Sequence, residues 1–265
     1  MNKAELPRPY SSNSEQRLLL ARILDKLEQC QNRSIPTCSG FLTPEERAEA
    51  QALLLRLPGV NPIFFGGFDE AERRVCAFLP DWLDYADWRD GDDCPVAALL
   101  AQVPGFSQFS HRDYLGSIMG LGLLREKIGD ILPTEAGAQV IVLRETLPIL
   151  LSQWQQVGRY PVKLSEIPLA SLSAGEAEVK IIKDSVASLR MDSVVASGFS
   201  ISRSRAGELI SGGKVLRNHV VCDKTDKLVE AGDVFSCRGL GKCTLSSIGG
   251  SSKKGRIWIE MARYI

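Results

Sequence analysis

Residues 202–206 read Ser-Arg-Ser-Arg-Ala and place two arginines where a helix is predicted to begin. Ser202 is a good N-cap residue, and an apolar stripe follows it at helical spacing. The positive end of a helix dipole favours carboxylates, so Arg203 and Arg205 each cost roughly a few tenths of a kcal/mol there. A bound phosphate reverses this balance, because backbone N–H groups and guanidinium groups then converge on it. We therefore predict an anion site at this helix start.

The surrounding residues strengthen the prediction of a phosphate contact. Ser204 adds a hydroxyl, and four more cations are predicted on adjacent elements: Arg190, Lys214, Arg217 and Lys224. The preceding helix is predicted to take its apolar side from positions within 186–195. Asp192 in that helix is expected to be a structural partner for a neighbouring arginine or a backbone N–H. The alternative for Arg203 and Arg205 is that they are solvated or pair with Glu208.

Residues 188–238 resemble the small RNA-binding module named after ribosomal small-subunit protein S-four. The resemblance is carried by Leu189-Arg-Met-Asp192, Ser202-Arg-Ser-Arg-Ala206, Leu209-Ile210, Gly213-Lys-Val215, Asn218 and the segment 229–234. Met191 stands where the family usually has leucine, which is a volume-conserving exchange. The resemblance implies a small αL-type RNA-binding domain with short strands, which reads the shape of structured RNA more than its sequence.

The distribution of charge agrees with RNA contact at the C-terminal end. The formal net charge of the 265 residues is zero, yet residues 176–265 hold 15 Lys and Arg against 10 Asp and Glu. Residues 1–175 hold 17 against 22. The basic third is therefore the predicted nucleic-acid contact.

The N-terminal 60 residues are predicted to form a helical unit. An apolar face recurs at helical spacing within residues 15–30. A second helix opens at Thr43, with Pro44 in its first turn and Glu46 completing a capping box.

Residues 61–170 are predicted to form a ferredoxin-like domain, related in topology to the RNA recognition motif. The order is βαββαβ with an extra leading strand at 74–79. The predicted strands are 95–103, 128–132, 138–143 and 161–167, and the helices are 110–120 and 147–156. The strand at 138–143 has no aromatic residue, so base stacking on the sheet is not expected. After a linker at 167–175, residues 171–265 form the third domain, and the fold class is α+β.

The triplet His111-Arg112-Asp113 invites a kinase interpretation, because it matches a catalytic-loop motif. Position 118 is isoleucine where that motif needs asparagine, and no DFG triplet follows. Asp113 is instead predicted to cap a helix with Ser110. His111 and Arg112 at that helix start, with Arg125 and Lys127, form a predicted secondary RNA contact. Packing or solvation of these residues is the alternative.

Two other enzyme classes are disfavoured. Arg190-Met-Asp192 is similar to the catalytic-aspartate region of pseudouridine synthases, but only 73 residues follow Asp192. A methyltransferase would need a glycine-rich cofactor loop, and Phe65-Gly-Gly-Phe68 is too short a match. No catalytic residues and no cofactor are expected.

The Gly/Ser-rich segment 249–255 is predicted to be a loop between two strands. Lys253 and Lys254 lie in it and form either a solvated turn or a basic finger that closes on RNA. Trp258 and Tyr264 on the last strand are expected to pack rather than to stack on bases.

Seven cysteines without a CxxC pair argue against a zinc site and against a disulfide framework. No apolar run is long enough to cross a bilayer, and the N-terminus lacks the core of a secretory signal. We expect a cytoplasmic monomer with reduced thiols.

The whole chain resembles the YlmH family, whose cyanobacterial members include the type labelled photosystem II S-four domain protein. The matching segments are Phe64-Phe-Gly-Gly-Phe68, Ser110-His-Arg-Asp-Tyr-Leu-Gly116, Arg125-Glu-Lys-Ile-Gly-Asp130 and Lys253-Lys-Gly-Arg-Ile257. This resemblance implies a non-catalytic RNA binder on the large ribosomal subunit, acting on ribosomal RNA, tRNA or both in rescue of stalled ribosomes. The non-enzyme alternative is an adaptor at a division site or a photosynthetic membrane complex.

Overall fold

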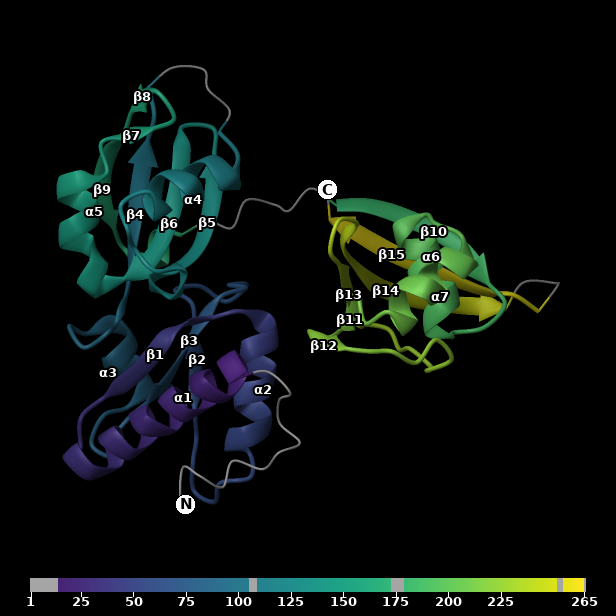
Figure 1. Cartoon of the computed structure of the whole chain (residues 1–265), viewed down its shortest axis with the longest axis horizontal. Coiled ribbons are helices and arrows are strands. Elements are labelled where there is room, and N and C mark those ends of the chain that lie inside the picture. Colours follow the sequence, from purple (N-terminus) through teal and green to yellow (C-terminus); the bar gives the residue numbers. More distant parts are fainter. Residues whose placement is uncertain (1–13, 105–108, 173–178, 252–254, 265) are drawn as a thin grey trace. The chain divides into compact units, whose positions relative to one another are not determined.

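The computed structural model describes residues 14–104, 109–172, 179–251 and 255–264. It divides into two compact units, residues 1–175 and 176–265, each of which is described here by itself (Figure 1). The finer division of the chain into three domains, with limits at 60/61 and 170/171, stays a prediction.

The N-terminal part of the first unit contains both predicted helices together with a sheet that was not predicted. Its elements are α1 (Ser14–Arg33), β1 (Thr37–Leu42), α2 (Pro44–Leu54), β2 (Ile63–Phe65), β3 (Arg74–Phe78) and α3 (Tyr85–Asp90). The capping box of α2 is confirmed: the Thr43 N–H donates to Glu46 Oε2 at 2.7 Å, and the Glu46 N–H donates to Thr43 Oγ1 at 3.2 Å.

The strand predicted at 74–79 does not lead the ferredoxin-like sheet. It is β3, which lies between β1 and β2 in an antiparallel sheet of its own (Figure 1). The prediction was wrong because β1 has the sequence Thr-Cys-Ser-Gly-Phe-Leu, in which Thr37 is the one β-branched residue and Ser-Gly interrupts the apolar pattern, and so β3 had no visible partner.

The middle part has the predicted ferredoxin-like topology. Its elements are β4 (Val96–Gln102), α4 (His111–Met119), β5 (Ile128–Thr134), β6 (Gly137–Leu143), α5 (Leu147–Gln153) and β9 (Lys163–Ile167), with a small hairpin of β7 (Gln156–Val157) and β8 (Tyr160–Pro161). Short 3-10 turns occur at η2 (Arg125–Lys127), η3 (Arg144–Thr146) and η4 (Leu169–Ser171). The sheet order β5-β6-β4-β9 with antiparallel pairing is that of a βαββαβ sandwich.

The second unit is a six-stranded antiparallel sheet with two short helices packed on it (Figure 1). Its elements are β10 (Val179–Val186), α6 (Met191–Phe199), α7 (Arg203–Ser211), β11 (Val215–Arg217), β12 (Val220–Val221), β13 (Val234–Cys237), β14 (Gly241–Ser251) and β15 (Ile257–Tyr264). Apolar side chains of both helices and of the sheet form one core. Asn218 and His219 both adopt positive φ, as a two-residue turn between β11 and β12 requires.

Two local predictions in this unit are corrected. Val186 ends strand β10 rather than belonging to the helix, which begins at Met191. All eight residues of β10 pair with β15. The strand was not predicted because it depends on pairing with this partner, which is distant in the sequence. The loop predicted to start at Gly249 is shorter, because β14 continues to Ser251.

Candidate functional site

The start of α6 is fixed to the segment that joins β12 to β13. The backbone N–H groups of Met191 and Asp192 donate to the carbonyls of Lys227 and Thr225 at 2.9 and 3.0 Å. Arg190 is the N-cap residue of α6 and forms a β-bridge with Leu228. These backbone contacts set where the Arg190 and Asp192 side chains emerge.

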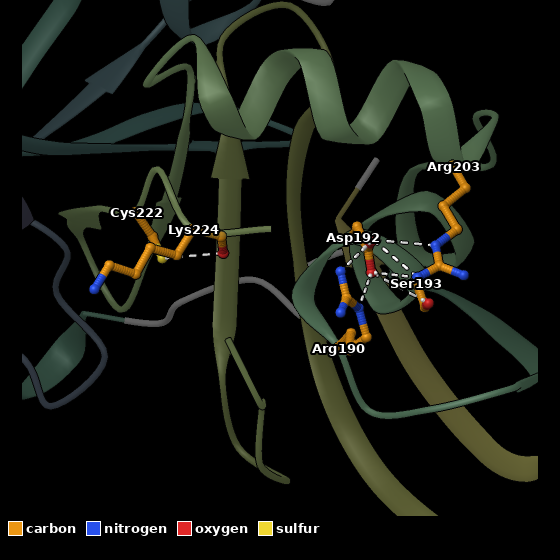
Figure 2. A network of polar contacts seen from close by, with 6 residues as sticks. All are labelled: Arg190, Asp192, Ser193, Arg203, Cys222 and Lys224. Atoms are coloured by element: carbon orange, nitrogen blue, oxygen red, sulfur yellow. Dashed lines mark hydrogen bonds and ion pairs between the residues drawn. The ribbon is translucent and has the colours of Figure 1, made fainter. Parts of the chain in front are cut away.

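Asp192 binds two arginines from different helix starts (Figure 2). Arg203 donates in a bidentate manner, with Nε at 3.1 Å from Oδ2 and an Nη2 atom at 3.2 and 2.9 Å from Oδ1 and Oδ2. Arg190 donates to the same two oxygens at 3.3 Å. The expectation that Asp192 is a structural partner for a neighbouring arginine is confirmed.

The carboxylate is buried, whereas both guanidinium groups remain accessible. The side chain of Asp192 is 10% exposed, and those of Arg190 and Arg203 are 38% and 53% exposed. Burial alone would raise the pKa of Asp192, but hydrogen bonds from Arg190 and Arg203 outweigh it and lower the pKa. The cluster therefore stays charged at neutral pH and presents a net positive charge to solvent.

The other predicted residues of α7 face solvent. The Ser202 hydroxyl accepts from the Arg205 N–H at 3.2 Å, so the predicted N-cap is confirmed. Arg205 pairs with Glu208 at 2.8 Å, which is the alternative considered for it. Ser204 lies exposed in the same first turn, and Lys214 is exposed just beyond the helix.

Arg217 is held by the fold rather than displayed to solvent. Its side chain is 15% exposed, and its guanidinium contacts Asp233 at 2.6 Å and the Leu228 carbonyl at 2.8 Å. Asp233 also accepts from the Asn218 amide and the Glu230 N–H. Burial acts to raise the pKa of Asp233, but these donors, led by Arg217, lower it. Arg217 thus secures the turn between β11 and β12.

Lys224 is exposed on the segment after β12, away from the Asp192 cluster in Figure 2. Its carbonyl accepts a weak contact from the Cys222 thiol at 3.9 Å. Lys253 and Lys254 lie outside the described residues.

The predicted secondary site lies on the first unit, at the start of α4. Asp113 accepts from both the N–H and the hydroxyl of Ser110 at 2.8 Å, so its carboxylate caps the helix as predicted. Partial burial and the nearby Arg125 lower the pKa of His111, which makes it uncharged at neutral pH. Arg112 is exposed beside it.

Arg125 and Lys127 are both engaged within the first unit. Arg125 donates to the carbonyls of Ile128 and Gly129, and burial, with Arg73 nearby, lowers its pKa to about 10. Lys127 forms an ion pair with Glu145. These contacts favour the packing alternative for the pair.

A second group of polar residues, which lies beside α6, was not predicted. Asp184, Ser193, Ser197 and Arg256 line the same hollow as Arg203. Ser193 and Ser197 are four residues apart on α6, which was a visible signal, but strand β10 was not predicted.

The described residues hold no group of three or more His, Cys, Asp or Glu that could bind a metal ion. All seven cysteines are free thiols. No helix in the described ranges combines the length and the apolar character that crossing a membrane requires.

Three family models match successive parts of the chain. "YlmH, N-terminal" matches residues 15–80, "Putative RNA-binding domain in YlmH" matches residues 100–171, and "S4 domain" matches residues 189–235. The last match covers all of α6 and α7 and the residues that contact the side chains of Asp192 and Asp233.

Two similar proteins agree with these matches. The "Ribosome-associated protein quality control protein P2" of Bacillus subtilis (strain 168) is 34% identical over 226 residues, which are 84% of this chain and 85% of that protein. The solved structure of cell division protein ylmH from Streptococcus pneumoniae has a TM-score of 0.51 at 22% identity and covers 60% of this chain and 95% of that one, which supports the fold alone. With family matches in this order and a relative this similar over most of both sequences, the chain belongs to the YlmH family.

Proposed function

We propose that this protein binds ribosomal RNA of the large subunit, tRNA or both through its C-terminal unit and acts without catalysis in quality control of stalled ribosomes. The observation that carries the proposal is the Asp192 cluster, in which one buried carboxylate holds two accessible arginines. The S-four and RNA-binding family matches support RNA as the ligand. The name of the Bacillus subtilis relative supports the ribosome as the place of action, and hence the cytosol.

The arginines can act as paired phosphate clamps. A guanidinium group that is already oriented loses less side-chain entropy when it binds a phosphate, and its planar fork suits two phosphate oxygens. Backbone N–H groups at the start of α7 lie next to Arg203 and add donors for the same ligand. Such contacts fix the position of an RNA helix without reading its bases.

The set of contacts is narrower than the sequence predicted. Arg190, Arg203, Ser204, Arg205, Lys214 and Lys224 remain in the proposed interface because they are accessible. Arg217 and Arg125 serve the fold in this proposal, since Arg217 is only 15% exposed and contacts Asp233 and the Leu228 carbonyl, and Arg125 is partly buried and donates to backbone carbonyls. Arg112 is the best remaining candidate for a secondary contact.

The absence of catalysis is supported by the two carboxylates that belong to enzyme-like motifs, because both are already engaged in structural hydrogen bonds. Both oxygens of Asp192 accept from arginines, and Asp113 caps α4. Neither is left to act as a nucleophile or a general base toward a substrate.

Co-sedimentation with purified large ribosomal subunits over a series of salt concentrations tests this proposal. Each phosphate contact adds about 0.9 to the slope of log affinity against log salt for a duplex. We expect a steep slope for the wild-type chain and a reduction of about one for Arg203→Gln. A slope near zero, with binding retained, contradicts RNA contact and points to a protein partner, as an adaptor would have.

A further inference from the structure

A groove of about 460 Å³ lies beside the Asp192 cluster, between α6 and β10. Hydroxyl groups line it from both elements: Ser193 and Ser197 lie one helical turn apart on α6, and Ser185 belongs to β10. Arg203 is shared between this groove and the Asp192 cluster. Ser193 lines the groove and also donates to Asp192 Oδ1 at 3.3 Å (Figure 2).

The charge of this groove distinguishes it from three other cavities in the described residues. Its lining has the cations Lys183, Arg203 and Arg256 and one carboxylate, Asp184, and Lys183 and Arg203 each also pair with a carboxylate outside the lining, Glu260 and Asp192. Of the three cavities in the first unit, one is lined by one more acidic than basic side chain, and the other two are lined by equal numbers of each. An anionic ligand is therefore favoured in the groove beside α6.

Asp184 is the feature that a simple phosphate site would lack. Its carboxylate accepts from the Ser197 hydroxyl at 2.8 Å and from the Ser185 N–H at 2.7 Å. Arg256 donates through Nε to the Ser185 hydroxyl at 3.0 Å and also to the Ser185 carbonyl, which ties β10 to the start of β15. An exposed carboxylate repels phosphate but accepts a hydrogen bond from a hydroxyl.

We propose that this groove binds the ribose-phosphate backbone of RNA, with phosphates at Arg203 and Arg256 and a ribose 2′-hydroxyl between them. The 2′-hydroxyl donates to Asp184 and accepts from Ser193 or Ser197, whose single hydroxyl hydrogen turns to the ribose oxygen from the aspartate that it contacts in the free protein. DNA lacks this hydroxyl, so the groove gives the protein a preference for RNA that arginine contacts alone do not supply. The inference rests on the proposed RNA-binding function, because it extends the same interface along α6.

The test compares a short labelled double-stranded RNA with DNA of the same sequence, measured by fluorescence anisotropy with the full chain at low salt. Asp184→Ala removes both the hydroxyl acceptor and the repulsive charge. We expect it to lose roughly fivefold in RNA affinity, as for one hydrogen bond, and to bind DNA as well as or better than the wild type. The ratio of RNA to DNA affinity should therefore fall in this variant. If Asp184 only supported the fold, its loss would weaken the binding of both nucleic acids and leave the ratio unchanged.

Ser193→Ala with Ser197→Ala is the second variant, and Ser211→Ala at the exposed end of α7 is its matched control. The double variant should lose RNA affinity and leave DNA affinity unchanged, while the control changes neither. Thermal melting checks the fold, and if the double variant is unfolded, the Asp184→Ala ratio decides.

The outcomes separate the two proposals. If the wild type binds neither duplex nor ribosomal RNA, the proposed function is wrong. If the wild type binds RNA and Arg203→Gln weakens it, but the groove variants keep the wild-type ratio of RNA to DNA affinity, only the groove assignment is overturned.

Discussion

At the scale of single residues, Asp192 determines how two arginines are presented. Its low exposure and its contacts with Arg190 and Arg203 make it the centre of the candidate site. The pKa of Asp192 is lowered in the folded protein. Its ion pairs therefore stabilise the fold at pH values above the ordinary aspartate pKa of about 3.9. That stabilisation is lost as the pH falls through the folded pKa.

Asp192→Asn should therefore lower the free energy of unfolding by about 1–2 kcal/mol at neutral pH, since charged hydrogen bonds are lost from a buried position. The deficit relative to the wild type should begin to shrink below about pH 4, the ordinary carboxyl pKa, and should disappear only below the lowered pKa of the folded protein, where the wild-type carboxylate is itself protonated. Urea unfolding followed by circular dichroism at several pH values measures both effects. A deficit that does not change with pH contradicts the charge-based account.

Arg217 and Arg205 form a second residue-scale comparison, because both were predicted contacts and only one is exposed. Arg217→Gln removes one partner of a buried ion pair and should cost about 3 kcal/mol or more. Arg205→Gln breaks an exposed pair and should cost under about 1 kcal/mol, while weakening RNA binding. Thermal melting and ribosome co-sedimentation of the two variants check the contrast. Equal losses of stability would show that Arg217 is not held as described.

At the scale of elements, local signals were sufficient where a helix or hairpin is determined by its own residues. Thr43 and Glu46 predicted the start of α2, and Ser202 predicted the start of α7. The βαββαβ order followed from alternating apolar runs. Strands β1 and β10 were missed because their partners, β3 and β15, are distant in the sequence. Asp192 was expected to pair with a neighbouring arginine, but the choice of Arg203 could not be predicted, since it depends on the turn between α6 and α7, where Ser200 has positive φ.

The cap of α7 can be tested at this scale. Ser202→Ala removes the hydroxyl that accepts from the Arg205 N–H and should lower the free energy of unfolding by about 1 kcal/mol. Ser204→Ala, two positions later and inside the helix, should be neutral or slightly stabilising because alanine is the better helix former. Denaturant titration of the two variants separates them. If both behave alike, Ser202 does not cap the helix.

At the scale of the whole molecule, the neutral net charge is the sum of two units of opposite charge. The acidic first unit and the basic second unit each have hydrophobic clusters of their own residues. Separate cores allow one unit to lose structure without the other. The second unit is the one that carries the proposed RNA face, so damage to it should abolish binding while much of the chain stays folded.

Amide hydrogen exchange of the full chain measures this independence. Arg217→Gln should raise exchange in β11, β13 and β14, which surround the Asp233 contacts, and leave β4 and β6 at wild-type protection. Ala97→Ser, which places a hydroxyl in the buried core around β4, is the converse variant and should act on the middle sheet alone. If either substitution raises exchange throughout both units, the two units unfold as one, and RNA binding then reports on the stability of the entire chain rather than on the C-terminal face.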